Sequence, residues 1–295
     1  MKFLKGLALS LMGFLLFLSL SIFGLVFMLH STLLNPDFVV REVNKLDVAS
    51  LARDLVKEQF GAQLPQWMAK PIDDTLANSG PWLKQQVDSA VYTGYDYFLG
   101  KSSTLNLSVD LGPLKADLKS RLWDAVSKSP PPELASIPPA MLQQYFNQLF
   151  DQYAGQIPTT YRFGLDSLGT DVRAQLEQVK QYIGYVQLSY NALIGLMLLL
   201  VLGIVLIHHQ VRSASRSLGS VFFSYGVVEY AGVMLGKNLG LPQLAGLVPV
   251  QFQTWLTQVL ADLVSPLEMF SLGAAIAGLV LLVVSFVYPR REPAS

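Results

Sequence analysis

Glu229 is the residue of greatest chemical interest, because it is an acidic side chain well inside an apolar stretch, residues 218–236. An ionised carboxylate near the centre of a bilayer costs about 2.5–3.5 kcal/mol, so such groups usually face a partner or an aqueous cavity. Candidate partners are Gln187, Tyr190 and Asn191 of the preceding apolar stretch. Two interpretations follow: a functional intramembrane carboxylate, or a structural one that is protonated or hydrogen-bonded.

A second candidate site is the aromatic run Tyr92-Thr93-Gly94-Tyr95-Asp96-Tyr97-Phe98. Aromatic rings beside an acid are typical of a pocket for a cation or a sugar. Tyr92, Tyr95 and Asp96 are therefore the pocket candidates. The alternative is that these rings, at helical spacing, pack into a core.

Two pairs of adjacent polar residues are weaker candidates for a functional site. Asp73 and Asp74 follow Pro71 at a predicted helix start, where acids are favoured anyway; otherwise they are half of a carboxylate pair or a metal site. His208 and His209 could bind a metal or sense pH. Adjacent helical side chains point about 100° apart, however, which favours simple anchoring beside lipid headgroups.

Sequence motifs of the common enzyme classes are absent. The chain has no cysteine, which excludes disulfides, thiolate metal sites and cysteine nucleophiles. It contains no His-Glu-x-x-His, no Gly-x-Ser-x-Gly and no glycine-rich loop for nucleotide phosphates. We therefore assign no catalytic, cofactor-binding or metal-binding residue, and we expect no enzyme. A bound metal ion, or a cleft joining Asp73, Asp74 or Asp96 to a second acid, would instead indicate a hydrolase.

The composition is that of a membrane protein. Of the 295 residues, 52% are hydrophobic and 14% are charged, whereas a soluble domain has about 25% charged residues. The net charge is zero, from 21 basic and 21 acidic residues. The chain therefore lacks the positive charge that nucleic-acid binding requires.

Four apolar stretches are long enough to be transmembrane helices, because about 20 helical residues cross a hydrocarbon core of about 30 Å. Three carry no charge: residues 6–29, 186–207 and 269–288. The fourth, residues 218–236, is richer in glycine and serine. Its Gly226, Gly232 and Gly236 would permit close helix packing.

The basic residues predict how these spans are oriented, since lysine and arginine gather on the cytoplasmic side of a span. Three pairs flank the spans: Lys2 and Lys5, Arg212 and Arg216, Arg290 and Arg291. All three lie on one side only if 218–236 crosses the membrane. The first stretch is longer than a signal-peptide core and lacks a cleavage site, which predicts an uncleaved signal anchor. We expect both termini in the cytoplasm and the spans in a bacterial inner membrane.

Residues 31–185 are a predicted extracytoplasmic domain that faces water. They hold 14 basic and 17 acidic residues, which is 31 of the 42 charges in the chain. Helix-start residues precede apolar stripes of helical spacing at several points, which predicts a mostly helical domain. These starts are Asn35-Pro36-Asp37, Ser79-Gly80-Pro81, Pro113 and Pro138.

Two features of this domain are not simple surface helices. Residues 104–110 alternate apolar and polar side chains, which predicts a short strand, and 159–163 is its candidate partner. From Asp166 the helical pattern continues into the second span without a proline. This predicts one helix that either tethers the domain or transmits movement across the membrane.

Between the last two spans, residues 237–266 are a predicted outer loop that is largely apolar. Its segment 249–263 predicts an amphipathic helix at the interface, with Trp255 at headgroup depth; packing beneath the domain is the alternative. In chain order the predicted segments are a cytoplasmic tip with the first span (1–30), the extracytoplasmic domain (31–185), the second span (186–207), a cytoplasmic loop (208–217), the third span (218–236), the outer loop (237–266), the fourth span (267–288) and a cytoplasmic tail (289–295).

Two segments carry a family resemblance: PWLKQQVDSAVYTGYDYFLGKSSTLNLSVDLGPLKADLKSRL, residues 81–122, and Leu34-Asn35-Pro36-Asp37-Phe38 after the first span. They resemble bacterial multi-pass membrane proteins whose helical extracytoplasmic domain follows the first span. The resemblance implies no activity and no site residue. The order of spans is similar to that of extracellular-loop permeases, which is an analogy of architecture alone. The short loop 208–217 leaves little room to dock an ATPase.

These expectations describe a mainly α membrane protein with four transmembrane helices, a mostly helical extracytoplasmic domain and a short two-stranded β element. The favoured function is non-catalytic: the domain binds, senses or scaffolds something in the cell envelope. The expected partners are the lipid bilayer and another envelope or membrane protein, with no cofactor and no nucleic acid; the oligomeric state is left open. The alternatives are a transport or mechanical-coupling subunit, motivated by Glu229, and a membrane-associated hydrolase.

Overall fold

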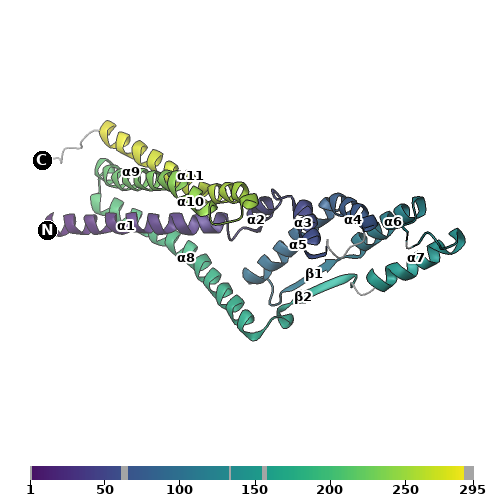
Figure 1. Ribbon diagram of the computed structural model, residues 1–295. Helices are drawn as coiled ribbons and strands as arrows, with labels where there is room; N and C mark the ends of the chain where they lie inside the picture. Colours follow the sequence, from purple (N-terminus) through teal and green to yellow (C-terminus); the bar gives the residue numbers. More distant parts are fainter. Residues whose placement is uncertain (1, 61–65, 133, 155–157, 289–295) are drawn as a thin grey trace. The chain divides into compact units, whose positions relative to one another are not determined.

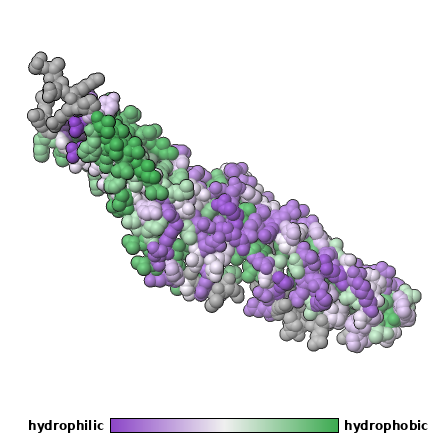
Figure 2. Space-filling view, turned by 90° about the horizontal axis from the view of Figure 1, so that it is seen from above, coloured by the Kyte–Doolittle hydropathy of each residue, from purple (hydrophilic) through white to green (hydrophobic). Residues whose placement is uncertain are grey.

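The computed structural model describes residues 2–60, 66–132, 134–154 and 158–288, and the predicted tail 289–295 lies outside them. The chain divides into two compact units: unit 1, Met1–Val39 with Val179–Ser295, and unit 2, Val40–Gln178. Unit 2 is narrower than the predicted domain, because helices α2 (Pro36–Val43) and α8 (Thr170–His208) begin in one unit and end in the other. Figure 2 shows hydrophobic side chains gathered over the long apolar helices and hydrophilic ones over unit 2.

Among the described residues, four helices are long and apolar enough to cross a membrane, as the sequence predicts, and they lie wholly or mostly in unit 1 (Figure 1). They are α1 (Lys2–Ser31), α8, α9 (Val211–Leu235) and α11 (Val250–Val287). Leucine, isoleucine and aromatic side chains from all four meet in one apolar core. Its buried members are Leu16, Leu20, Leu200, Ile204, Leu218, Tyr225 and Ala274.

Helices α9 and α11 approach so closely that glycines line their contact. A Cβ atom on Gly219 would lie 2.9 Å from the carbonyl oxygen of Gly278, and one on Gly226 would overlap the backbone of Ala275. Close packing at Gly226 is therefore confirmed. It is wrong for Gly232 and Gly236, where an added Cβ meets no atom within 4 Å, because these residues do not face a neighbouring helix.

The connection between α8 and α9 is shorter than predicted. The cytoplasmic loop was expected over 208–217, yet only His209 and Gln210 lie outside the helices. Ala214 and Ser215 are buried in the first turns of α9, and this packing extends the helix toward its N-terminus. The turn is made by His209, whose φ of +53° lies in the left-handed region, and by Gln210, which is extended.

Replacing His209 by glycine is expected to stabilise unit 1 by about 0.5–1 kcal/mol, because glycine adopts positive φ without the steric cost of a Cβ atom. Thermal unfolding in detergent micelles should show a midpoint raised by roughly 2–4 °C. The neighbouring change Gln210→Gly is the control, since its extended backbone suits any residue and glycine gains nothing there. A lowered midpoint for His209→Gly would contradict the expectation.

The predicted outer loop, 237–266, is largely helical. Helix α9 continues through a π-helical turn, η2 (Gly236–Gly240), into α10 (Leu241–Ala245), and α11 then runs from Val250 through Pro266 to Val287. The interfacial helix expected over 249–263 is thus wrong as a separate element, since this segment is the first part of α11. Proline is tolerated inside such long apolar helices because neighbouring helices compensate for the lost hydrogen bond.

Unit 2 is mostly helical, as predicted, and its helices begin where the sequence places capping residues and prolines. Asn35 caps α2 by accepting a hydrogen bond from the N–H of Asp37 at 3.0 Å. One expectation is wrong: Pro71 lies inside a helix rather than at its start, because α4 continues through it. The remaining helices are α3 (Val48–Phe60), α4 (Gln66–Asn78), α5 (Gly80–Phe98), α6 (Gly112–Lys128), α7 (Pro139–Ala154) and the short 3-10 turn η1 (Leu165–Ser167).

The predicted strand pair is confirmed. Strand β1 (Asn106–Asp110) pairs antiparallel with β2 (Thr160–Gly164), with Leu107 opposite Phe163 and Val109 opposite Tyr161. A lone two-stranded pair is marginal in water. Here it is covered on one side, because Leu105 and Leu107 pack with side chains of helix α5.

The predicted continuous helix is also confirmed as α8, which begins at Thr170, four residues later than Asp166. Its 39 residues run without interruption from unit 2 into unit 1. The same helix therefore contributes to the core of unit 2 and to the apolar helices of unit 1.

Candidate functional site

Glu229 lies half-buried on α9. Tyr190 stacks instead on the imidazole ring of His30, with ring centres 4.5 Å apart, and also contacts Phe23 of α1. Within the described residues Glu229 forms no hydrogen bond or ion pair. The pairing considered with the second span is therefore wrong, and the ring contacts of Tyr190 are with α1.

Tyr225, one helical turn before Glu229, is a residue that the sequence reasoning missed. It is fully buried between the rings of Phe17 and Phe270. Its hydroxyl lies against Gly24 of α1 and has no hydrogen-bond partner in the described part of the chain. The sequence pattern that could have identified Tyr225 is its spacing of four residues from Glu229. This spacing puts the two side chains on one face of α9, close enough to interact electrostatically.

An ion pair joins Lys237 of η2 to Glu268 of α11. About a quarter of each side chain is exposed, 23% for Lys237 and 25% for Glu268. Lys237 was predicted to lie in a loop and no partner was predicted for Glu268, although the two residues lie on neighbouring helices of a hairpin. The pair links η2, which continues α9, to α11.

Removing one member of this pair, by Glu268→Gln, is expected to cost about 1–2 kcal/mol, between the values for exposed and for buried ion pairs. The charge-swapped double variant Lys237→Glu with Glu268→Lys should recover most of that loss. Unfolding midpoints of Lys237→Glu, of Glu268→Lys and of the double variant form the cycle that measures the coupling. Additive losses in the double variant would show that the pair contributes nothing.

The aromatic run lies on α5, and its three pocket candidates do not share one environment. Tyr92 is 42% exposed. Burial raises the pKa of Tyr95, which is half-buried. Asp96 is exposed and lies 3.7 Å from the ammonium of Lys101. The residue of this run that enters the core is Tyr97, which is 0% exposed.

Tyr97 links the core of unit 2 to helix α8. Its hydroxyl donates a hydrogen bond of 2.7 Å to Oε1 of Glu177, 80 residues later in the chain. The ring belongs to a cluster, called here the Tyr97 cluster, that contains the first turns of α8 through Leu176. The members of the Tyr97 cluster are Tyr97, Leu105 and Leu165, with Phe98, Leu107, Leu168 and Leu176 packed against them.

Burial, together with the neighbouring carboxylate of Glu177, raises the pKa of Tyr97 to about 12. An unfolded tyrosine ionises near pH 10. The stability contributed by neutral Tyr97 is therefore complete below about pH 10 and is lost as the pH rises from about 10 to about 12. The free energy of unfolding, measured with denaturant, should decline across this pH range. Tyr97→Phe should reduce this decline. Tyr161→Phe, at a residue that is 58% exposed, should leave the decline unchanged.

Two of the three acidic residues considered for hydrolysis, Asp74 and Asp96, lie beside lysines. Asp74 binds the ammonium of Lys70 at 2.9 Å, one turn earlier on α4, and Asp96 faces Lys101. In the part of the chain that the structure describes, no group of three or more histidine, aspartate or glutamate side chains could hold a metal ion. His208 and His209 are separated by the end of α8, and Lys5 lies near enough to His208 for their charges to interact.

Comparison of the chain with protein-family models, with curated protein sequences and with solved structures finds no match. The resemblance of residues 81–122 to bacterial multi-pass membrane proteins stays a prediction. Function must be inferred from the residues of this chain and from their packing.

Proposed function

We propose that the chain is a non-catalytic protein of a bacterial inner membrane, whose unit 2 lies outside the cytoplasm and binds, senses or scaffolds a component of the envelope. Lys5, His208 and the two arginines of the first turns of α9, Arg212 and Arg216, support this orientation, because basic residues gather on the cytoplasmic side. Tyr182 and Tyr185 of α8, both more than half exposed, suit the opposite interface.

The observation that carries the proposal is the double role of α8. Its first turns are part of the Tyr97 cluster, through Leu176 and the hydrogen bond between Tyr97 and Glu177. The rest of the same helix is apolar and long enough to cross the membrane. A ligand that repacks the Tyr97 cluster would therefore displace an element that continues into the bilayer.

Orientation is tested by cysteine labelling, for which the chain is suited because it contains no cysteine. Single cysteines replace Ser108, which is exposed on β1, and Lys5, which is exposed near the start of α1. On intact spheroplasts a membrane-impermeant maleimide should label Ser108→Cys, and it should label Lys5→Cys only after lysis. The reverse pattern would refute the extracytoplasmic assignment.

Coupling through α8 is tested with a spin label on Gly195→Cys, an exposed position in the apolar half of the helix. In nanodiscs the change Glu177→Gln should alter the spectrum of this label, because it weakens the contact with Tyr97. Asp171→Asn is the matched control: it makes the same chemical change at an exposed position of the same helix. Unchanged spectra in both variants would leave α8 as a tether only.

A second candidate, a transport or mechanical-coupling subunit, is favoured by Glu229 and Tyr225. Both carry polar groups inside a span without a hydrogen-bond partner among the described residues. Proteoliposomes loaded with a pH-sensitive dye and given a membrane potential would test it. A proton flux that Glu229→Gln abolishes would support this candidate, and equal fluxes in both proteins would remove it.

A further inference from the structure

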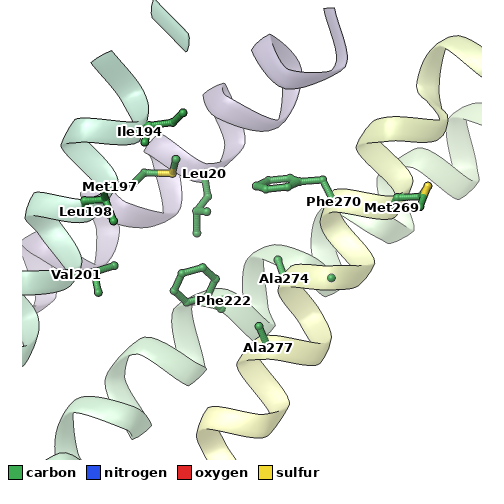
Figure 3. A pocket seen from close by; sticks show the side chains of 11 residues that line it. Leu20, Ile194, Met197, Leu198, Val201, Phe222, Met269, Phe270, Ala274 and Ala277 are labelled. Carbon is green, nitrogen blue, oxygen red and sulfur yellow. The ribbon is translucent and has the colours of Figure 1, made fainter. Parts of the chain in front are cut away.

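A groove of about 530 Å³ opens between α8 and α11 in unit 1 (Figure 3). Leu20 of α1 and Phe222 of α9 form its floor, and both point into it. Met197 of α8 lies on one wall, and Gly273 and Ala277 of α11 lie on the other. All 11 lining residues are apolar, so the groove offers no side-chain donor or acceptor to a ligand.

The glycine of this wall, Gly273, is not required by helix packing. On the opposite face of α11 a Cβ atom on Gly278 would overlap the backbone of α9 at Phe223, so glycine is needed there for close contact. A Cβ atom on Gly273 would meet no atom within 4 Å. The missing side chain of Gly273 therefore leaves space in the groove and does not serve a close contact between two helices.

The lining and the surroundings restrict what can fill this space. Apolar cavities do not hold ordered water, and without donors or acceptors the groove cannot fix a polar ligand or an ion. Its volume is in the range of ligand pockets. Since the four surrounding helices are apolar enough to cross a membrane, the molecules that reach its open side are lipids.

We propose that the groove is a binding site for one acyl chain of a membrane phospholipid, held by contacts with Met197, Phe222 and the wall around Gly273. The inference concerns unit 1 alone and does not depend on a binding role for unit 2. It requires that this phospholipid exchange more slowly than the lipids that merely surround the helices.

The test is native mass spectrometry of the full chain, purified from nanodiscs of phosphatidylethanolamine and phosphatidylglycerol and washed with detergent. The chain should retain one phospholipid, and Gly273→Leu, which fills the groove, should reduce the retained fraction at least about tenfold. Gly195→Leu is the matched control, because this glycine lies on α8 outside the lining and an added Cβ atom there meets nothing. It should retain the lipid fully.

Three results would overturn the proposal. The first is equal retention by Gly273→Leu and the unaltered chain, and the second is no retained phospholipid in either. The third is a retained molecule whose mass is that of a polyprenyl compound or a free fatty acid, which would assign the groove to a different ligand. Ala277→Phe fills the same groove from the next turn, so it replaces Gly273→Leu if that variant melts earlier than the unaltered chain.

Discussion

Replacing Gly226 by leucine is expected to destabilise unit 1 by about 3 kcal/mol or more, because the added side chain has no space between α9 and α11. Even a Cβ atom at this position would overlap the backbone of Ala275 and approach the carbonyl oxygen of Ser271 at 2.6 Å. Backbone atoms cannot turn aside as a flexible side chain can, so the two helices must separate. The unfolding midpoint in detergent should fall by roughly 10 °C.

Gly232→Leu is the control for this prediction, since it makes the same change two turns later on the same helix. No atom lies within 4 Å of a Cβ atom placed on Gly232. Its unfolding midpoint should stay near that of the unaltered chain or rise slightly, because leucine favours a helix over glycine. If both variants lost the same stability, the close contact between α9 and α11 would not be the cause.

Replacing Tyr97 by alanine is expected to destabilise unit 2 by about 3–5 kcal/mol, the usual cost of removing a fully buried ring. The change empties the centre of the Tyr97 cluster and leaves Glu177 without its donor. Tyr97→Phe keeps the ring and removes only the hydroxyl, so we expect a loss of about 1–3 kcal/mol. Denaturant unfolding of the full chain, followed by protease cleavage within unit 2, measures both.

Tyr92→Ala is the matched control, because it removes the same side chain from the same helix at a position that is 42% exposed. We expect a loss below about 1 kcal/mol. A loss equal to that of Tyr97→Ala would mean that the aromatic run stabilises α5 as a whole, rather than through the contact between Tyr97 and α8.

Features with a local signal could be predicted from the sequence. The four spans follow from hydropathy and length. The pairing of β1 with β2, about 50 residues apart, follows from period-two alternation in one segment and from β-branched and aromatic residues in the other. The continuity of α8 follows from a helical pattern that no proline interrupts.

Features that depend on tertiary contacts could not be predicted. Residues 92–98 contain four aromatic side chains, and the tertiary contacts with Leu105, Leu165 and α8 decide that Tyr97 enters the core. Pro266 is an ordinary signal for a helix end, and packing against α9 overrides it. Hydropathy does not tell which helix faces which, so it could not show that Tyr190 stacks on His30 of α1 and does not pair with Glu229.

The length of α11 has a consequence for how the protein responds to the membrane around it. Its 38 residues extend about 57 Å, whereas the hydrocarbon core is about 30 Å thick. A continuous helix cannot shorten, so we expect tilt to be its response to hydrophobic mismatch. Glycine contacts and the ion pair of Lys237 with Glu268 hold α9 to α11, so the hairpin should lean as one body when bilayer thickness changes.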